Sequence, residues 1–289
     1  MSTPPTLKLP PCARAYRLET GRGTFAVHDA RPDGAPAGTA LLVPGFTGSK
    51  EDFIALLEPL AAAGFRAVAV DGRGQHESPG PHDESAYEQR ELALDVHAQA
   101  EALGAPVHLL GHSLGGLITR AAVLLDPAPF HSLTVLSSGP AAIAEPQQAR
   151  VRMLIEALAT LDMEAVWQAM RALDPVETPD RATPPEVGAF LHRRWLNTLP
   201  EQLIVTGRQM LAEPDRVAEL AAVELPKHVV SGTVDYAWPV PLMDAMAERL
   251  AARRTVIDGA EHSPNAEQAA ATAAALVEFW RGAVSLRSA

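Results

Sequence analysis

The residue best suited to nucleophilic chemistry is Ser113, at the centre of the sequence Gly-His-Ser-Leu-Gly at positions 111–115. An apolar run precedes this pentapeptide, and the residues after it have the pattern of a helix. A sharp turn from a strand into a helix exposes the serine hydroxyl at the edge of a sheet, and the flanking glycines leave room for that turn. The amino terminus of the helix favours negative charge, so the N–H of Leu114 is the expected donor to an oxyanion.

The base that would activate this serine is predicted to be His262. A serine hydroxyl needs a group that takes its proton and later returns it, and imidazole has a suitable pKa near neutral pH. The serine turn resembles that of the α/β-hydrolases, in which the acid and then the histidine follow the serine along the chain. His262 follows the last apolar run and precedes the last helix, and it is the only histidine after His228. His112 is adjacent to the serine, but neighbouring side chains in a tight turn point in different directions.

The acid that would orient His262 is predicted to be Asp235, which ends the segment Gly-Thr-Val-Asp after an apolar run. A carboxylate there would fix the imidazole tautomer and stabilise the imidazolium. Asp258 is the alternative, but it lies four residues before His262 on the same strand end. The second oxyanion donor is expected in the loop Pro-Gly-Phe-Thr-Gly at 44–48, from the N–H of Phe46.

The elements that must position these residues alternate in type. Short apolar runs of strand length alternate with stretches of helical periodicity, which predicts an α/β fold with a parallel sheet and helices on both sides. Residues 15–28 have the pattern of an amino-terminal β-hairpin, which would bring the sheet to eight strands. The expected strands are 39–43, 66–70, 107–110, 133–136, 228–230 and 255–257, and the expected helices are 50–63, 84–103, 114–125, 241–252 and 266–280.

The alternation stops between Gly139 and Pro226, where helical stretches broken by prolines replace the strands. This pattern predicts a helical cap inserted into the α/β core. The cap is expected at 140–225, and the core at 1–139 and 226–289.

Large apolar residues are frequent in the predicted cap. They would either pack its helices together or form the floor of an apolar pocket. As substrate contacts we expect Phe46, Trp167 and Trp238. The expected substrate is a small molecule that is uncharged and partly apolar.

Composition argues against several other classes of function. A formal net charge of −11 at pH 7 disfavours binding to nucleic acid and stable association with anionic membranes. Cys12 is the single cysteine, so no intrachain disulfide or thiolate cluster is possible. The chain has no H-E-x-x-H pair, P-loop or dinucleotide-binding glycine pattern, so neither metal nor cofactor is expected. It also has no signal-peptide or transmembrane pattern, which predicts a cytoplasmic protein.

Several ordered motifs together resemble the α/β-hydrolase superfamily over roughly the whole chain, in the carboxylesterase, haloperoxidase and lipase-like branch with a helical cap. The resemblance implies a serine hydrolase that cleaves a carboxylic ester of a small or medium substrate through an acyl-enzyme on Ser113. The same residues could instead serve thioester or carbon–carbon hydrolysis, lyase or perhydrolase chemistry, and a non-catalytic binding protein on this fold is the third alternative. The motifs are Val-Pro-Gly-Phe at 43–46, Asp-Gly-Arg-Gly-Gln-His-Glu-Ser at 71–78, the serine turn, Gly-Thr-Val-Asp at 232–235 with Pro239, and Gly-Ala-Glu-His at 259–262.

Two positions depart from the family pattern. Pro44 replaces the histidine that usually starts the first loop, which leaves the backbone donor in place. His76 stands where the family has its second glycine. We expect a tolerated loop substitution there, and the alternative is that His76 or Glu77 lines the acyl pocket. Haloalkane dehalogenases and epoxide hydrolases form a related branch with an aspartate at the position of Ser113, so their chemistry is disfavoured.

Overall fold

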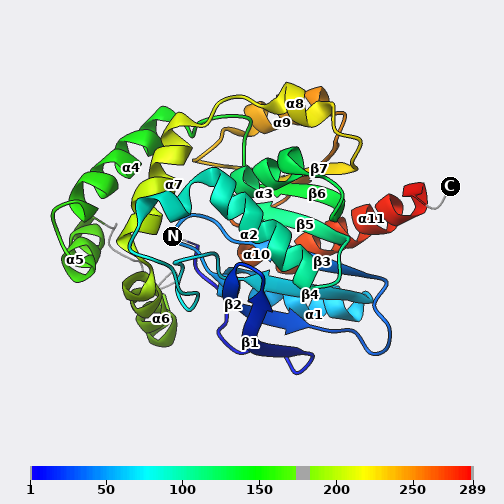
Figure 1. The fold of residues 1–289 in the computed structure, drawn as a ribbon, viewed down its shortest axis with the longest axis horizontal. Coiled ribbons are helices and arrows are strands. Elements are labelled where there is room, and N and C mark those ends of the chain that lie inside the picture. The colour runs from blue at the N-terminus through cyan, green and yellow to red at the C-terminus, as the bar shows by residue number, and fades with distance from the viewer. Residues whose placement is uncertain (1, 174–182, 288–289) are drawn as a thin grey trace.

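The centre of the protein is an eight-stranded sheet in the computed structural model, which describes residues 2–173 and 183–287 (Figure 1). The strands lie in the order β1-β2-β4-β3-β5-β6-β7-β8. β1 and β2 form an antiparallel hairpin, β2 also runs antiparallel to β4, and all later neighbours are parallel. The predicted eight-stranded, mostly parallel sheet is therefore confirmed. The strands are β1 (Ala13–Thr20), β2 (Gly23–Ala30), β3 (Gly38–Val43), β4 (Phe65–Val70), β5 (Val107–His112), β6 (Phe130–Leu136), β7 (Lys227–Gly232) and β8 (Arg253–Ile257).

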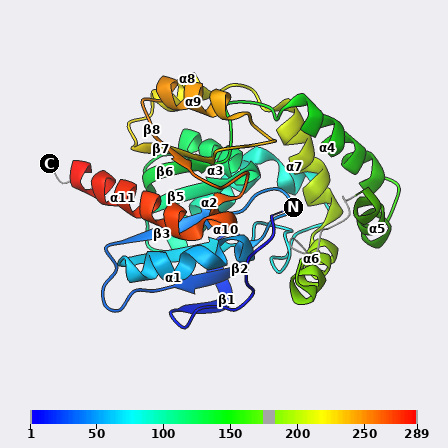
Figure 2. The same cartoon turned by 180° about the vertical axis from the view of Figure 1, so that it is seen from behind.

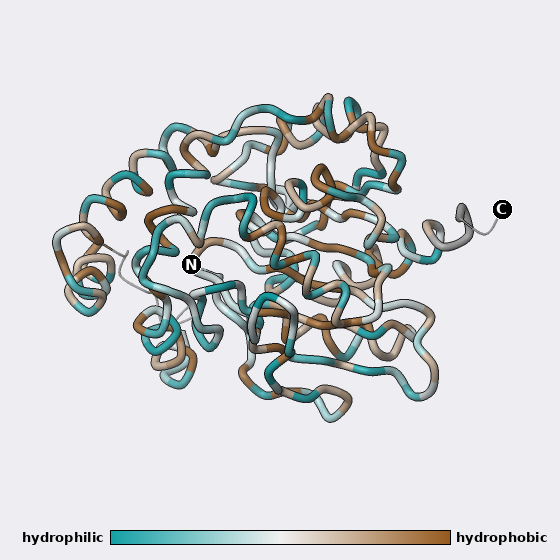
Figure 3. Tube along the Cα trace, in the orientation of Figure 1, coloured by the Kyte–Doolittle hydropathy of each residue, from teal (hydrophilic) through white to brown (hydrophobic). Residues whose placement is uncertain are grey.

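The central strands are buried on both faces, because successive side chains of a strand point to opposite sides of the sheet. In β3, Leu41 packs into one apolar cluster and Leu42 into another, and Leu109 and Leu110 of β5 divide in the same way. Figure 3 shows hydrophobic residues concentrated on the central strands and hydrophilic ones on the outer helices. Burial on both faces explains why these strands are continuous apolar runs in the sequence.

Helices cover both faces of the sheet. α1, α10 and α11 lie in front of it in Figure 2, and α2 and α3 lie in front of it in Figure 1. Trp280 of α11 is buried in one apolar cluster and Met243 of α9 in the other. The predicted helix 84–103 is divided at Glu88, where ψ is 145° and the backbone is not helical. These elements are η1 (Lys50–Phe53), α1 (Ile54–Ala62), η2 (Glu84–Tyr87), α2 (Gln89–Ala102), α3 (Leu114–Leu125), α9 (Val240–Arg249), α10 (Pro264–Glu267) and α11 (Ala269–Arg287).

The described part of the chain between β6 and β7 contains helices and no strand. α4, α5, α6 and α7 gather at one end of the molecule, on the left in Figure 1. α8 instead contacts α3 and α9, so the last part of the predicted cap segment packs on the core. None of the described helices is long and apolar enough to cross a membrane. The helices of this segment are α4 (Glu145–Leu158), α5 (Met163–Leu173), α6 (Pro185–Asn197), α7 (Pro200–Ala212) and α8 (Val217–Ala221).

Candidate active site

Ser113 lies in the turn between β5 and α3, in a conformation that residues with side chains rarely adopt. Its φ is 56° and its ψ is −119°, and such backbone strain costs on the order of 1–3 kcal/mol. The N–H of Ser113 donates to the carbonyl oxygen of Leu136 at 2.9 Å. A Cβ on Gly111 would lie 2.2 Å from the carbonyl oxygen of Gly115, and one on Gly115 would lie 2.4 Å from that of Val43. The turn thus requires both glycines of the pentapeptide.

Two hydrogen bonds join Ser113, His262 and Asp235. His262 Nε2 lies 3.0 Å from Ser113 Oγ, and His262 Nδ1 lies 2.8 Å from Asp235 Oδ2. The three residues are between 6% and 8% exposed. They follow β5, β7 and β8, whose carboxyl ends meet at one edge because the strands are parallel. Asp258, the alternative acid, comes directly after β8, and its side chain is exposed.

The carboxylate of Asp235 is fixed in place by its own loop. Oδ1 accepts hydrogen bonds from the N–H groups of Ala237 at 2.7 Å and Trp238 at 3.0 Å. Oδ2 is thereby directed at His262. An imidazole whose Nδ1 faces a carboxylate carries its proton on Nδ1, so Nε2 is left to accept a proton from the serine.

Two further residues, His112 and Tyr236, contact His262, and the sequence analysis assigned no role to either. His112 Nε2 lies 2.8 Å from the carbonyl oxygen of His262, so this nitrogen carries a proton and donates it. Burial, and to a smaller extent the neighbouring His262, lower the pKa of His112 to about 3. The ring centroid of Tyr236 lies 4.7 Å from that of His262. Adjacency to Ser113 and to Asp235 was the only sequence signal for these two residues.

The loop after β3 passes close to Ser113. A Cβ on Gly45 would lie 3.1 Å from the Cβ of Ser113, so this approach favours glycine. The following residue, Phe46, lines the same cavity as Ser113. Leu114 begins α3, and the N–H groups of a first helical turn have no partner within the helix. Both residues predicted as oxyanion donors are therefore adjacent to the serine.

A cavity of about 160 Å³ lies beside Ser113 and His262. A cavity of about 150 Å³ in another protein holds one benzene molecule, so this space suits a group of similar size. Apolar side chains in its wall include Val151 of α4 and Met210 of α7. Asp52 also lines it.

The charge of Asp52 is paired within the protein. Arg194 of α6 donates to Asp52 Oδ1 at 2.7 Å, and both side chains are almost fully buried. The carboxylate also accepts a hydrogen bond at Oδ2 from the N–H of Ser49 at 3.2 Å. The cavity wall at Asp52 is therefore polar without an unpaired charge.

The structure corrects the prediction for two of the three substrate contacts. Trp238 is fully buried, its Nε1 donates to the carbonyl oxygen of Ala141 at 2.8 Å, and it does not line the cavity. Trp167 is packed in the apolar cluster of α5 and α6, 5.1 Å from the ring of His192, and is also absent from the cavity wall. Both indoles pack helices and loops together. Phe46, the third predicted contact, does line the cavity.

Comparison with known proteins assigns the chain to a family. The model of the alpha/beta hydrolase family matches residues 40–275. A pimeloyl-[acyl-carrier protein] methyl ester esterase of Aeromonas hydrophila is 30% identical over 221 residues, which are 71% of this chain and 81% of that protein. A Variovorax paradoxus protein, provisionally assigned as a carbamate hydrolase, is 35% identical over 123 residues, which span 42% of this chain and only 44% of that protein.

Solved structures have the same fold. An esterase from Thermogutta terrifontis superimposes with a TM-score of 0.75 at 22% identity, over 94% of this chain and 99% of that chain. A hydrolase from Pseudomonas aeruginosa also gives a TM-score of 0.75, at 24% identity, over 92% of this chain and 98% of that chain. Because the family model matches residues 40–275, which is most of the chain, the chain belongs to the alpha/beta hydrolase family.

Proposed function

We propose that the protein hydrolyses a carboxylic ester of a small or medium, partly apolar substrate through an acyl-enzyme on Ser113. The observation that carries this proposal is the pair of hydrogen bonds from His262 to Ser113 and Asp235, beside a cavity of about 160 Å³. The similarity to a methyl ester esterase over most of both chains supports an ester as the substrate.

The first half of the reaction forms the acyl-enzyme. Ser113 Oγ attacks the ester carbonyl carbon while His262 Nε2 takes the hydroxyl proton, and Asp235 stabilises the resulting imidazolium. The carbonyl oxygen becomes an oxyanion that accepts hydrogen bonds from the N–H groups of Leu114 and Phe46. The oxyanion then collapses, the bond to the alkoxy oxygen breaks, and His262 gives its proton to the leaving alcohol.

The second half of the reaction uses water in place of the alcohol. His262 takes a proton from a water molecule, whose oxygen attacks the acyl carbon, and the bond to Ser113 Oγ breaks as the oxyanion collapses. The proton returns to Ser113, and the carboxylic acid leaves. Val151 and Met210 in the cavity wall favour an apolar acyl group, whereas the paired charge of Asp52 and Arg194 offers no free cation for a charged one.

Labelling with a fluorophosphonate probe tests the nucleophile. The wild-type protein should be labelled, and the variant Ser113→Ala should not be, while its melting temperature stays close to that of the wild type. A wild-type protein that is folded but remains unlabelled would contradict the proposal.

Turnover of p-nitrophenyl esters tests the substrate class. The wild-type protein should hydrolyse short acyl esters, and Ser113→Ala should reduce kcat by at least about a thousandfold, because the attacking group is lost. Labelling without turnover of any ester would instead favour thioester, carbon–carbon, lyase or perhydrolase chemistry at the same serine.

A further inference from the structure

A buried group of charged side chains lies next to the candidate active site, near the carboxyl ends of β3 and β4. Lys50 is at its centre, and its Nζ contacts carboxylate oxygens of Glu51 at 2.9 Å, Asp71 at 2.9 Å and Glu77 at 2.7 Å. The side chains of Lys50 and Asp71 are 1% and 0% exposed. One ammonium group thus faces three carboxylates, and the formal charges of these four residues leave an excess of two negative charges.

Three buried atoms of this region have no hydrogen-bond partner, and one of them is Nδ1 of His28, whose Nε2 lies 3.7 Å from Glu51 Oε1. Glu51 is 7% exposed, and its Oε1 contacts Lys50, but its buried Oε2 is unpartnered. His76 is also 7% exposed, and its Nδ1 is unpartnered. Burying a polar atom without a partner costs about 1–3 kcal/mol, and more for a charged group. The unpartnered carboxylate oxygen and the free ring nitrogen are therefore available to a further donor or to a cation.

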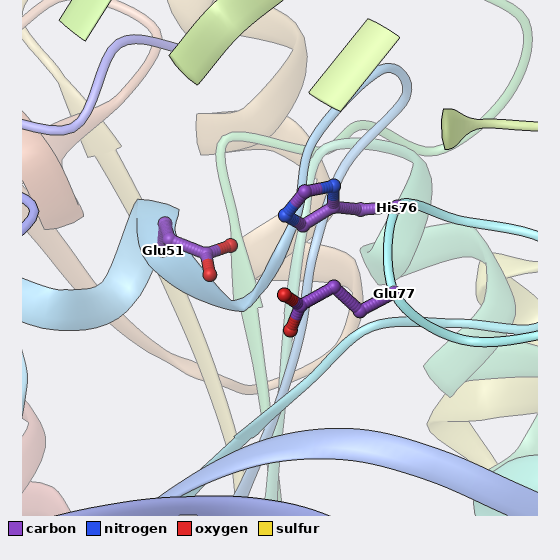
Figure 4. A group of neighbouring side chains, drawn as sticks. All are labelled: Glu51, His76 and Glu77. Atoms are coloured by element: carbon purple, nitrogen blue, oxygen red, sulfur yellow. The ribbon is translucent and has the colours of Figure 1, made fainter. Parts of the chain in front are cut away.

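The side chains of Glu51, His76 and Glu77 converge on one space, from η1 and from the loop after β4 (Figure 4). One possible ligand atom from each lies within 4.8 Å of the other two. Lys50 contacts one oxygen of Glu51 and one of Glu77, so the second oxygen of each carboxylate is left for another ligand. The side chain of Glu77 is 51% exposed, which gives an ion access from solvent.

We propose that Glu51, His76 and Glu77 bind one divalent transition-metal ion, such as Zn²⁺. An imidazole with two carboxylates suits first-row transition metals, whereas Mg²⁺ and Ca²⁺ prefer sites made of oxygen ligands alone. Ligand distances of about 2.0–2.2 Å to Zn²⁺ require small inward rotations of the three side chains.

No local motif indicates this site, because its ligands come from separate segments of the chain. Glu51 lies in η1, and His76 with Glu77 lies in the loop after β4. A search for metal-binding spacings on one helix, such as H-E-x-x-H, cannot find residues that only the sheet brings together. His76 attracts attention in the sequence only as a replacement for a glycine of the family pattern.

His76 offers a variant that removes the imidazole while keeping the backbone. Its φ is 44°, in the left-handed region that glycine adopts without steric cost. The variant His76→Gly loses the contact of the ring with Phe190, 5.5 Å away between ring centroids, but it relieves the positive φ, so it should still fold. Glu51→Gln is a second variant, because it keeps the size of the side chain and removes its charge.

Isothermal titration calorimetry with ZnCl₂ tests the proposal on protein that has been treated with EDTA and then freed of it. The wild-type protein should bind one Zn²⁺ per chain, and His76→Gly and Glu51→Gln should each weaken this binding at least tenfold. Co²⁺ should give visible absorption bands in the wild-type protein that are lost in His76→Gly, because the imidazole is a ligand.

Two control variants separate this site from other histidine–carboxylate pairs. His262→Ala removes the histidine that contacts Asp235, and His82→Ala removes an exposed histidine that lies 3.1 Å from Glu201. Both should keep stoichiometric Zn²⁺ binding. Binding that survives in His76→Gly, or that is lost in either control, would overturn the proposal, and so would a wild-type protein that does not bind Zn²⁺ at micromolar concentrations.

Discussion

Two histidines at the same end of the sheet, His262 and His76, differ in how their rings are held. Both ring nitrogens of His262 have a partner, Ser113 on one side and Asp235 on the other. His76 has an unpartnered Nδ1 and lies beside carboxylates that Lys50 already contacts. His262 can take a proton from Ser113 at Nε2 while Asp235 holds its Nδ1, so this ring can transfer a proton. His76 has a free Nδ1 beside the carboxylates of Glu51 and Glu77, so this ring can help to bind a cation.

The same residue types thus have different consequences in the two regions. Around Ser113 the rate of the reaction depends on the hydrogen bonds that His262 makes with Ser113 and Asp235. Around Lys50 the balance of buried charge matters, and its loss affects the stability of the fold. Substitutions in the first region should therefore change rate more than stability, and substitutions in the second should change stability more than rate.

The largest expected effect is on the rate, from Asp235→Asn. The amide oxygen can keep the hydrogen bonds that Ala237 and Trp238 donate, so the loop should hold its shape. The amide NH₂ would then face His262 Nδ1 and favour the tautomer with its proton on Nε2, which cannot accept the serine proton. We expect kcat for an ester substrate to fall by about 10⁴-fold, with the melting temperature within a few degrees of the wild type. A fall in kcat of less than tenfold would contradict the expectation that substitutions around Ser113 act mainly on the rate.

The second effect is on stability, from Lys50→Met. This substitution leaves Glu51, Asp71 and Glu77 around a buried apolar side chain, and breaking a buried ion pair from one side costs about 3–5 kcal/mol. Urea denaturation in EDTA should give a free energy of unfolding lower by that amount. Glu77→Gln is the matched comparison, and its effect should be smaller because Glu77 is half exposed. Equal losses in the two variants would contradict the central role of Lys50.

A smaller effect should appear as a pH dependence in His76→Gly. Burial, as the largest cause, lowers the pKa of His76 to about 4, from an ordinary value of 6.5. Between pH 6.5 and 4 the unfolded chain therefore binds a proton that the folded chain does not, and folding stability falls as the pH falls. In EDTA, the wild-type free energy of unfolding should fall over this range by about 1–3 kcal/mol more than that of the glycine variant. If the free energies of unfolding of the two proteins change in parallel with pH, His76 does not have the lowered pKa.

The smallest expected effect concerns the ring beside His262. Tyr236 lies 4.7 Å from the imidazole, and an aromatic ring stabilises a nearby cation by about 0.5–1 kcal/mol at exposed sites. Tyr236→Ala should lower kcat/KM about two- to fivefold, and Tyr236→Phe should retain most of the activity because the ring remains. If Tyr236→Phe loses as much as Tyr236→Ala, the hydroxyl rather than the ring is responsible.

The position of the serine site could be predicted because each residue follows a recognisable strand. Ser113, Asp235 and His262 lie in the loops that follow apolar runs, and parallel strands bring their carboxyl ends to one edge. The choice between Asp235 and Asp258 followed from the same reasoning. The sheet was predictable for a related reason, since strands buried on both faces form continuous apolar runs.

Side-chain direction was less accessible to sequence reasoning. Trp167 and Trp238 were expected in the pocket because of their residue type, but a strand or helix pattern does not say which gap an indole fills. The contact of His112 with the carbonyl oxygen of His262 joins residues 150 positions apart, so no local pattern could indicate it. The charged group around Lys50 depends in the same way on contacts between separate loops.

The position of Ser2 has a practical consequence for the design of expression vectors. Ser2 lines the cavity beside Ser113, and its carbonyl oxygen accepts a hydrogen bond from Arg194 at 2.7 Å. The amino-terminal end lies between the inserted helices and the sheet, whereas α11 leads to the opposite side of the molecule (Figure 1). A purification tag fused before Ser2 would start beside the cavity, so assays of substrate preference are better made with a tag at the carboxyl end.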